Sequence, residues 1–246
     1  MEIDVALVPQ VARPGDPAVF VVIDEIRAST TITTLLDAGC TDLYIEGSVV
    51  GARRLGRDTG SLLVGERRAL RPPGFDYDNS PTILSAANVR GRGVVLSTTN
   101  GTAILKMLRA SGDVLVGCLR NAGACAAAAF ELAVARDVGV RVVCAGRLRR
   151  FVLEDAIAGG VIARRDAELA AARGVSAALT DGARAAISLR DAYPDELAAL
   201  LDSDGARTLR SIGQEADIAF CAALDLSDTV PVLRDGEPMR IERLGA

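Results

Sequence analysis

The sequence of 246 residues contains no histidine and no tryptophan, and Lys106 is its only lysine. Without histidine, a Ser-His-Asp triad, a Cys-His pair, a histidine general base and a histidine-ligated zinc site are all excluded. Proton transfer at an active site must therefore involve carboxylates, cysteine, tyrosine, lysine or a metal-bound water. Because nearly all basic residues are arginine, a phosphate group would be bound by guanidinium groups, which can donate two parallel hydrogen bonds.

Aromatic residues make up 3% of the chain, whereas hydrophobic residues make up 50%. The core is therefore expected to consist of Val, Leu, Ile and Ala. A net charge of −4 gives no indication of a nucleic-acid partner. The five cysteines form no CxxC pair, which is typical of reduced, buried thiols in a cytoplasmic protein. The acidic N-terminus shows no signal peptide, and no apolar run is long enough to predict a membrane span.

Short β-branched runs alternate with amphipathic segments over most of the chain, a pattern that predicts βαβ units and a mostly parallel sheet. We expect a three-layer α/β/α fold with a helical C-terminal third, 181–213, and a short terminal hairpin over 230–241. The chain is expected to form a single domain, 1–246, or else two lobes, 1–146 and 147–246. Strands are predicted over 19–23, 42–46, 62–65, 94–96, 114–118 and 140–144, and helices over 28–38, 101–110, 122–136 and 154–173.

Polar clusters follow four of the predicted strands and begin at Asp24, Glu66, Ser97 and Cys144. Open parallel sheets bind ligands at this edge, and helix N-termini there offer free N–H groups to anions. Taken singly, such Ser, Thr and Asn residues are ordinary helix caps. The concentration of arginine and carboxylate at one edge instead favours a phosphate site with Mg²⁺, for which the carboxylate ligands would come from Asp24, Glu66, Glu154 and Asp155.

Cys144 and Arg150 have the C-x₅-R spacing of cysteine-dependent phosphatases, in which a thiolate attacks the phosphorus. In a chain so rich in arginine this spacing is a weak signal, and the favoured interpretation of Cys144 is a small buried residue at a strand end. A cysteine mechanism therefore stays as an alternative. No G-x-G-x-x-G follows the first predicted strand, which counts against a dinucleotide-binding dehydrogenase.

Five segments, in this order, resemble the 2-phosphosulfolactate phosphatase family: 23–31, 65–67 with 74–81, 97–102, 144–146 with 153–156, and 217–222. The resemblance covers almost the whole chain. It implies an α/β/α fold, Mg²⁺ dependence and hydrolysis of the phosphate monoester of a 2-hydroxy acid. In the family's named role the product is sulfolactate, on a route to coenzyme M. The second segment adds Asp76 to the expected metal ligands, and Asn79 and Ser80 to the expected substrate contacts.

The sequence thus predicts a cytoplasmic, Mg²⁺-dependent phosphatase for a small, acidic, phosphorylated substrate. The attacking group stays open between water, Asp24 and Cys144, and a non-catalytic anion-binding regulator on the same fold is a further alternative. A homodimer is compatible with these features, and neither nucleic acid nor membrane is an expected partner. The expected catalytic residues are Asp24, Arg27, Cys144 and Glu154, the metal ligands Asp24, Glu66, Asp76 and Asp155, and the phosphate or substrate contacts Ser29, Thr30, Arg67, Asn79, Ser80, Thr99, Asn100, Gly101, Thr102 and Arg147.

Overall fold

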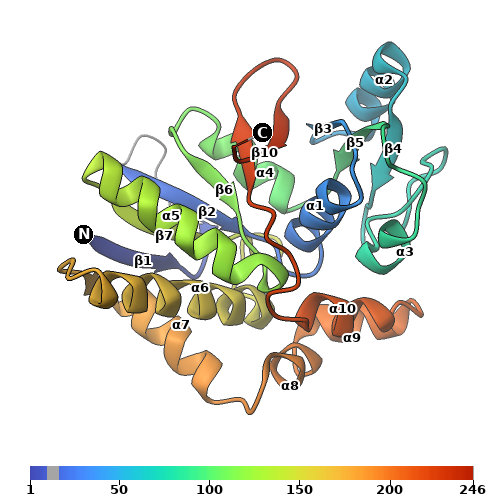
Figure 1. Ribbon diagram of the computed structural model, residues 1–246. Helices are drawn as coiled ribbons and strands as arrows, with labels where there is room; N and C mark the ends of the chain where they lie inside the picture. Colours follow the sequence, from blue (N-terminus) through green and yellow to red (C-terminus); the bar gives the residue numbers. More distant parts are fainter. Residues whose placement is uncertain (10–16, 246) are drawn as a thin grey trace.

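Strand β2 (Ala18–Ile23) shows why the chain folds into layers. Val19, Val21 and Ile23 pack into one hydrophobic core, whereas Phe20 and Val22 pack into another on the opposite face. A strand that buries both faces requires helices on both sides of its sheet. The computed structural model, which describes residues 1–9 and 17–245, is accordingly a three-layer α/β/α fold, as predicted (Figure 1).

The strands of the described residues form one ten-stranded sheet in the order β4-β5-β3-β10-β9-β6-β2-β7-β1-β8. Two parallel blocks, β4-β5-β3 and β6-β2-β7-β1-β8, are joined by the antiparallel hairpin β9-β10. The predicted C-terminal hairpin is therefore confirmed, and it lies in the middle of the sheet. The remaining strands are β1 (Glu2–Ala6), β3 (Asp42–Ile45), β4 (Leu62–Gly65), β5 (Gly93–Ser97), β6 (Val114–Val116), β7 (Gly139–Cys144), β8 (Ala178–Leu179), β9 (Pro231–Arg234) and β10 (Arg240–Arg243).

The helices divide between the two faces of the sheet. α5 (Ala122–Arg136), α6 (Leu153–Ala172) and α7 (Asp181–Asp191) contribute to one core, whereas α1 (Ala28–Asp37) and α4 (Gly101–Leu108) contribute to the other. The C-terminal third is helical, as predicted. Its shorter helices are α8 (Glu196–Leu201), α9 (Asp204–Ser211) and α10 (Ala216–Ala222), and the other short elements are α2 (Val49–Thr59), α3 (Pro81–Ser85) and the 3₁₀ helix η2 (Leu119–Asn121).

Six elements were not predicted: β1, β8, α2, α3, η2 and α10. β1 buries Ile3 and Val5 but carries acidic residues between them, so its apolar signal is weak. α2 buries only Ala52 and Gly56, and is defined mainly by its ends. Ser48 accepts a hydrogen bond from Gly51 N at the start, and Gly60 ends the helix in the left-handed conformation. Most of α2 is therefore a solvated surface helix.

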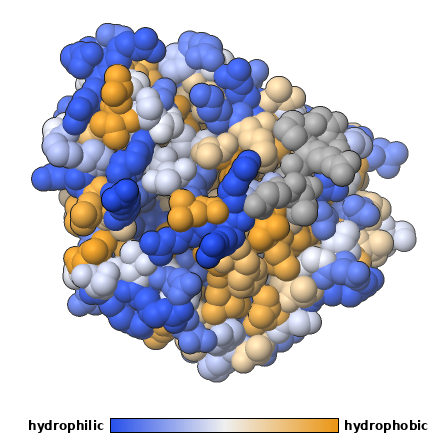
Figure 2. Space-filling model, turned by 180° about the vertical axis from the view of Figure 1, so that it is seen from behind, coloured by the Kyte–Doolittle hydropathy of each residue, from blue (hydrophilic) through white to orange (hydrophobic). Residues whose placement is uncertain are grey.

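The surface mixes polar and apolar side chains. Seen from behind, hydrophobic residues gather mainly in the lower middle of the face, between hydrophilic groups (Figure 2). Two large exposed hydrophobic side chains, Leu148 and Phe151, follow β7. Within residues 1–9 and 17–245, no helix is long and apolar enough to cross a membrane.

Candidate active site at the carboxyl ends of the strands

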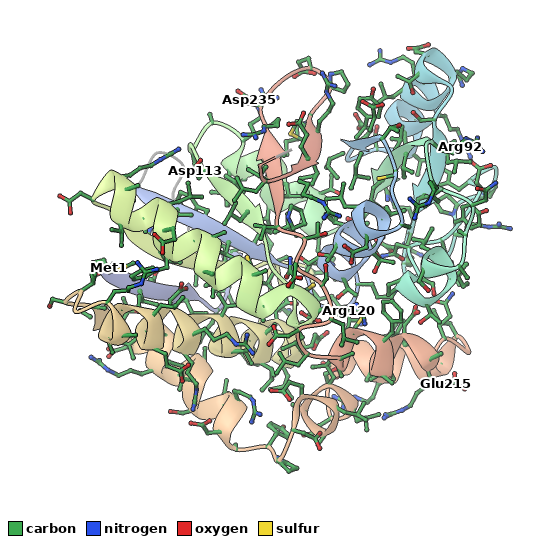
Figure 3. The ribbon with its side chains drawn as sticks, viewed as in Figure 1. Met1, Arg92, Asp113, Arg120, Glu215 and Asp235 are labelled. Carbon is green, nitrogen blue, oxygen red and sulfur yellow. The ribbon has the colours of Figure 1, made fainter. Side chains whose placement is uncertain are left out.

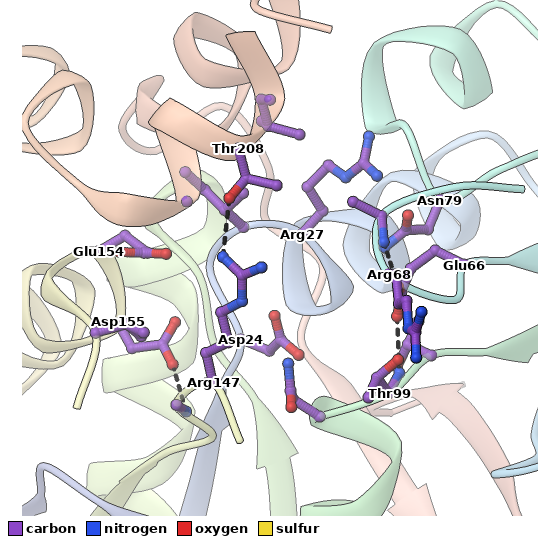
Figure 4. Close-up of a pocket in the computed structure, with 18 of the residues that line it drawn as sticks. Asp24, Arg27, Glu66, Arg68, Asn79, Thr99, Arg147, Glu154, Asp155 and Thr208 are labelled. Atoms are coloured by element: carbon purple, nitrogen blue, oxygen red, sulfur yellow. Dashed lines mark hydrogen bonds between the residues drawn. The ribbon is translucent and has the colours of Figure 1, made fainter. Parts of the chain in front are cut away.

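A cavity of about 550 Å³ is lined by the segments that directly follow β2, β4, β5 and β7, together with parts of α6 and α9. This is the edge at which open parallel sheets bind ligands. Figure 4 shows carboxylates of α6 on one side, the segments after β4 and β5 on the other, and Asp24 and Arg147 between them. The lining residues are Asp24, Ile26, Arg27, Glu66, Arg67, Arg68, Ala69, Asn79, Thr98, Thr99, Asn100, Gly146, Arg147, Leu148, Val152, Glu154, Asp155, Gly205, Thr208 and Leu209.

Asp24 follows β2 and is buried at the centre of the site. Its Oδ2 accepts a hydrogen bond of 2.7 Å from Gly101 N, and its own amide donates to Ser29 Oγ at 2.8 Å. A Cβ at position 101 would lie 2.9 Å from Asp24 Oδ2, so this close approach requires glycine. Burial raises the pKa of Asp24 to about 6, against the lowering effect of the hydrogen bonds that its carboxylate accepts from the amides of Gly101 and Ala28. The sequence places a carboxylate here whose ionisation costs more than it would in water.

Glu154 and Asp155 occupy the first turn of α6, where a helix favours negative charge. Both oxygens of Asp155 accept backbone hydrogen bonds of 2.8 Å, from Glu25 N and Gly146 N. Glu154 Oε2, in contrast, is buried and has no hydrogen-bond partner in the described part of the chain. Burial raises the pKa of both carboxyl groups, and the charge of Asp24 adds to the effect. The three acids therefore repel one another in a poorly solvated place.

The opposite side of the cavity is formed by the segment after β4. Glu66 Oε1 accepts from Thr99 N at 2.8 Å, and Glu66 Oε2 accepts from Ala69 N at 2.9 Å. The guanidinium of Arg67 donates to the carbonyl oxygens of Ser97 and Gly47 at 3.0 and 2.8 Å. Arg67 thus lines the cavity but uses its donors to hold the backbone together. Arg68 is exposed, and no hydrogen bond or ion pair occupies its guanidinium within the described residues.

Two further arginines reach the cavity from the other segments. Arg27 is only 3% exposed, and its Nη1 donates to Asp217 Oδ2 at 2.8 Å. Arg147 is exposed, and its Nη1 donates to Thr208 Oγ1 of α9 at 2.8 Å, the contact drawn as a dashed line in Figure 4. Arg27, the buried arginine, is therefore paired with a carboxylate, whereas Arg147, the exposed one, donates to a neutral hydroxyl group.

Most of the residues that the sequence predicted for the site come together in this cavity. Those that line it are Asp24, Arg27, Glu66, Arg67, Asn79, Thr99, Asn100, Arg147, Glu154 and Asp155. Those that do not line it are Ser29, Thr30, Asp76, Ser80, Gly101, Thr102 and Cys144. Four of these seven residues form hydrogen bonds with neighbouring residues instead: Ser29 and Gly101 with Asp24, Thr102 with Thr98, and Thr30 with Glu25.

Cys144 lies in the hydrophobic core at the end of β7, with no exposed surface. Burial raises its pKa well above that of an ordinary thiol, which opposes formation of a thiolate. Arg150, six residues on, is exposed and does not line the cavity. Neither Cys144 nor Arg150 therefore lines the cavity, and the structure places the thiol predicted as a catalytic group in the hydrophobic core instead.

Asp76, which the sequence predicted as a metal ligand, is exposed and does not line the cavity. Its Oδ2 accepts a hydrogen bond of 2.7 Å from Leu63 N. The carboxylate anchors the loop after β4 to the strand. Ser80 likewise caps α3 and donates to Asp217 at 2.7 Å rather than facing the cavity. Residues 67–79 form an irregular loop without helix or strand, and Asn79 at its end lines the cavity.

Sequence reasoning missed several lining residues, of which Arg68, Thr98 and Thr208 carry donor groups. Arg68 adjoins the predicted Arg67, so extending that strand-end cluster by one position would have found it, whereas Thr98 lies within the predicted segment 97–102 but was not singled out. Thr208, with Gly205 and Leu209, comes from α9 and follows no strand. A Cβ at position 205 would lie 2.2 Å from Glu154 Oε1, so this close contact of α9 with the acid also requires glycine.

Metal binding can be tested against the side chains that are present. Among residues 1–9 and 17–245, no group of three or more His, Cys, Asp or Glu side chains has a geometry that could hold a metal ion. Mg²⁺ does not require such a cage, because it is commonly bound by one or two carboxylates together with waters and substrate phosphate. The unpartnered Glu154 Oε2 and the mutual repulsion of Asp24, Glu154 and Asp155 fit a hard cation.

The fold and the cavity define an α/β protein with a polar small-molecule site at its strand ends. The model of the 2-phosphosulpholactate phosphatase family matches residues 6–236. A protein of Thermus thermophilus, described as a probable 2-phosphosulfolactate phosphatase, is 41% identical over 237 residues, covering 94% of this chain and 96% of the relative. Relatives with the same description from Deinococcus radiodurans and Carboxydothermus hydrogenoformans are 39% and 33% identical, covering 90% and 94% of this chain and 90% and 92% of their own lengths. The chain belongs to the 2-phosphosulpholactate phosphatase family and is a phosphoric monoester hydrolase.

Proposed function

We propose that this chain hydrolyses 2-phosphosulfolactate to sulfolactate and inorganic phosphate, with Mg²⁺ as cofactor, in the cytoplasm. The substrate is the one that the relatives' descriptions print. The observation that carries the proposal is the meeting of three charge-coupled carboxylates with arginines in one cavity. In hydrolysis, a water oxygen bonds to phosphorus, the bond to the 2-oxygen breaks, and that oxygen receives a proton. A place in coenzyme M synthesis stays a prediction from the family resemblance.

Asp24 and Glu154 are the carboxylates best suited to hold the metal. Glu66 and Asp155 accept short backbone hydrogen bonds of 2.8–2.9 Å on both oxygens, whereas Glu154 Oε2 is unpartnered. Asp24 also accepts an amide on each oxygen, but the bond from Ala28 N to its Oδ1 is long at 3.4 Å, and its charge acts on Glu154. When bound, Mg²⁺ would neutralise phosphate oxygens and reduce their repulsion of the attacking group. Without a cation, a dianionic phosphate would enter a cavity that already holds several acids.

The remaining groups divide into an inner and an outer set. Arg27 and Asn79 are buried beside Asp24 and suit the phosphate, because the inner end is where the carboxylates lie. Arg68 and Arg147 are exposed at the mouth and suit the second acidic group of the substrate. Guanidinium binds both phosphate and sulfonate oxygens with paired N–H donors. A small substrate with two acidic groups matches this division.

The attacking group is a water or Asp24. Either mechanism requires the Asp24 carboxylate, as a base or ligand in the first case and as the nucleophile in the second. Rapid quench with radiolabelled substrate separates them, because only the second mechanism leaves phosphate covalently attached to the protein. Asp24→Glu would reposition the carboxylate by one methylene, so the label should disappear together with the activity.

The test of the function is turnover of 2-phosphosulfolactate with and without Mg²⁺, beside a panel of other phosphorylated hydroxy acids. We expect activity that chelation abolishes and Mg²⁺ restores. Asp24→Asn should lose at least about a hundredfold in kcat/KM, or about 2.7 kcal/mol. Cys144→Ser, the matched variant at the neighbouring strand end, should keep most of its activity. Full turnover in excess chelator, or an active Asp24→Asn beside an inactive Cys144→Ser, would reject the proposal.

A further inference from the structure

The guanidinium of Arg27 is buried, and its position depends on a carboxylate from the C-terminal helices. A charge that is only 3% exposed needs a partner, because burial without one is costly. Nη1 donates to Asp217 Oδ2 at 2.8 Å and also to Gln214 Oε1. Among the described residues, Nη1 is the one nitrogen of this guanidinium with a hydrogen-bond partner. The other nitrogens are thus left for a ligand in the cavity.

Asp217 is 1% exposed and does not itself line the cavity. It belongs to the first turn of α10, nearly 200 residues from Arg27 in sequence. Besides Arg27 it accepts hydrogen bonds from Ser80 Oγ at 2.7 Å and from Thr82 N at 3.2 Å. One carboxylate therefore joins the start of α1 to the start of α3, and both segments adjoin the site.

The segment held by Asp217 also contains Asn79, which is, like Arg27, a buried polar residue of the cavity wall. The carbonyl oxygen of Asn79 accepts from Thr31 Oγ1 at 2.7 Å, which fixes the backbone. The residue lines the cavity, and its side-chain Oδ1 is buried and unpartnered within the described part of the chain. Asp78, one residue earlier, accepts a hydrogen bond from Gln214 Nε2. Gln214, in the turn before α10, and Asp217, in its first turn, thus hold the residues on both sides of Asn79.

α10 is itself firmly attached. Arg120 of η2 stacks over the ring of Phe220 at 4.0 Å and donates to its carbonyl oxygen at 3.1 Å. In Figure 3, Arg120 lies beside α10 while Glu215, at the other end, points outward. A rigid helix can hold a side chain in one place more precisely than a mobile loop can.

We propose that Asp217 is a positioning residue for phosphate binding, acting through Arg27 and, on the same wall, through Asn79. The inference rests on the proposed function, in which Arg27 binds the phosphate. Asp217 fixes one side of the guanidinium, so that its remaining donors are directed at the ligand before the ligand arrives. Such prior ordering lowers the entropy lost on binding.

A double-mutant cycle in phosphate binding tests this. The variants are Asp217→Asn, Arg27→Ala and the double variant, and the readouts are the Kd of inorganic phosphate by calorimetry and the KM and kcat for 2-phosphosulfolactate. Asp217→Asn preserves volume and acceptors for Ser80 and Thr82 but removes the charge that holds Arg27. We expect about a tenfold weaker Kd and a similar rise in KM. In the Arg27→Ala background, Asp217→Asn should have less than about a twofold further effect.

Glu196→Gln is the matched control, because it removes a similar ion pair from the helical region away from the cavity. Glu196 Oε1 accepts from Arg190 Nε at 2.8 Å, and neither residue lines the cavity. Phosphate binding by this variant should equal that of the wild type. Should Asp217→Asn fail to fold, Gln214→Ala provides the second variant. It removes the other acceptor of Arg27 Nη1 together with the donor to Asp78, so the larger part of its loss, the part that acts through Arg27, should vanish in the Arg27→Ala background.

Additive losses in the double variant, or an unchanged or tighter Kd in Asp217→Asn, would overturn the inference. A loss of stability alone, with unchanged Kd and KM, would do the same and would leave Asp217 a structural residue. Absence of turnover in the wild type would reject the proposed function instead. The phosphate cycle would still decide the role of Asp217, since it requires binding and not hydrolysis.

Discussion

The turn after β4 (Arg67–Leu70) and the turn after β7 (Arg147–Arg150) have the same backbone but different neighbours. In each, the first residue exchanges two backbone hydrogen bonds with the fourth. The two central residues of each turn have positive φ, between 51° and 65°, the pattern of a type I′ turn. Glycine or asparagine usually occupies such positions, and neither turn has one. The chain thus forms the same strained turn twice at the edge of its site.

The turns differ in what their first arginine contacts. Arg67 folds inward onto backbone carbonyls, whereas Arg147 reaches over the cavity to Thr208. The two turns share a second feature, because at each of them an acidic residue that lines the cavity accepts a hydrogen bond from a backbone amide. Glu66 accepts the amide of Ala69, and Asp155 accepts the amide of Gly146. Equal local geometry therefore does not give equal roles, and two carboxylates predicted as metal ligands are engaged in supporting turns.

The largest expected effect comes from removing these supporting acids. Asp155→Ala leaves two buried amides, those of Glu25 and Gly146, without acceptors, at about 1–3 kcal/mol each. We expect the free energy of unfolding to fall by about 3 kcal/mol, measured by urea denaturation. Glu66→Ala should cost about 1 kcal/mol, because its surroundings are half-exposed and water can replace the carboxylate. Equal losses would mean that burial does not distinguish the two turns.

The arginines provide the next comparison. Arg67→Ala removes donors to Gly47, Ser97 and Glu66, so we expect a loss of about 2 kcal/mol in stability. Arg147→Ala removes one exposed hydrogen bond and should change stability by less than about 0.5 kcal/mol. Its effect should instead be a higher KM for a substrate with two acidic groups. The assignment of roles would be reversed if Arg147→Ala destabilised the fold and Arg67→Ala affected only KM.

Asp166 provides a contrast with Glu66 and Asp155, whose oxygens accept backbone amides. It is buried, and neither of its carboxylate oxygens has a hydrogen-bond donor in the described structure. Burial raises its pKa well above 3.8. Its contribution to stability is therefore present at low pH and is lost as pH rises from about 4 through the raised pKa. Asp166→Asn removes this titration, so wild-type stability should fall relative to the variant by up to about 1.4 kcal/mol per pH unit. Denaturation curves from pH 5 to 7 measure the difference. Parallel pH dependences would show that Asp166 is solvated.

Much of the fold could be predicted because β-branched runs such as Val19–Ile23 are strong local signals. β1 could not be predicted, because its buried residues Ile3, Val5 and Ala6 are interrupted by Asp4 and preceded by Glu2, which leaves a weak apolar pattern. The central place of the hairpin was also beyond the sequence. It depends on β10 pairing with β3 and β9 pairing with β6, contacts between segments far apart in the chain.

The site was predictable where it follows strands, as at Asp24 and Asn100, because the carboxyl ends of parallel strands share one edge. It was not predictable where helices complete it. Thr208 and Asp217 reach the site through the packing of α9 and α10, which no local pattern encodes. The sequence also could not tell Arg67 from Arg68. Both line the cavity, and what distinguishes them is that Arg67 donates to the backbone carbonyls of Ser97 and Gly47, contacts that only the fold brings together.

The smallest expected effect concerns the turn backbone itself. Ala69 has φ of 65°, in the left-handed region that disfavours residues with a Cβ. Ala69→Gly relieves this strain while keeping the amide that binds Glu66, at the price of greater freedom in the unfolded chain. We expect a net gain of about 0.5 kcal/mol in the free energy of unfolding. Ala86→Gly is the matched control, at an exposed position with φ of −103°, where glycine should cost about 0.5–1 kcal/mol. Urea denaturation of both variants gives the sign of each effect. If Ala69→Gly destabilised the protein as much as Ala86→Gly does, the turn after β4 would not be strained, and its likeness to the turn after β7 would carry no energetic meaning.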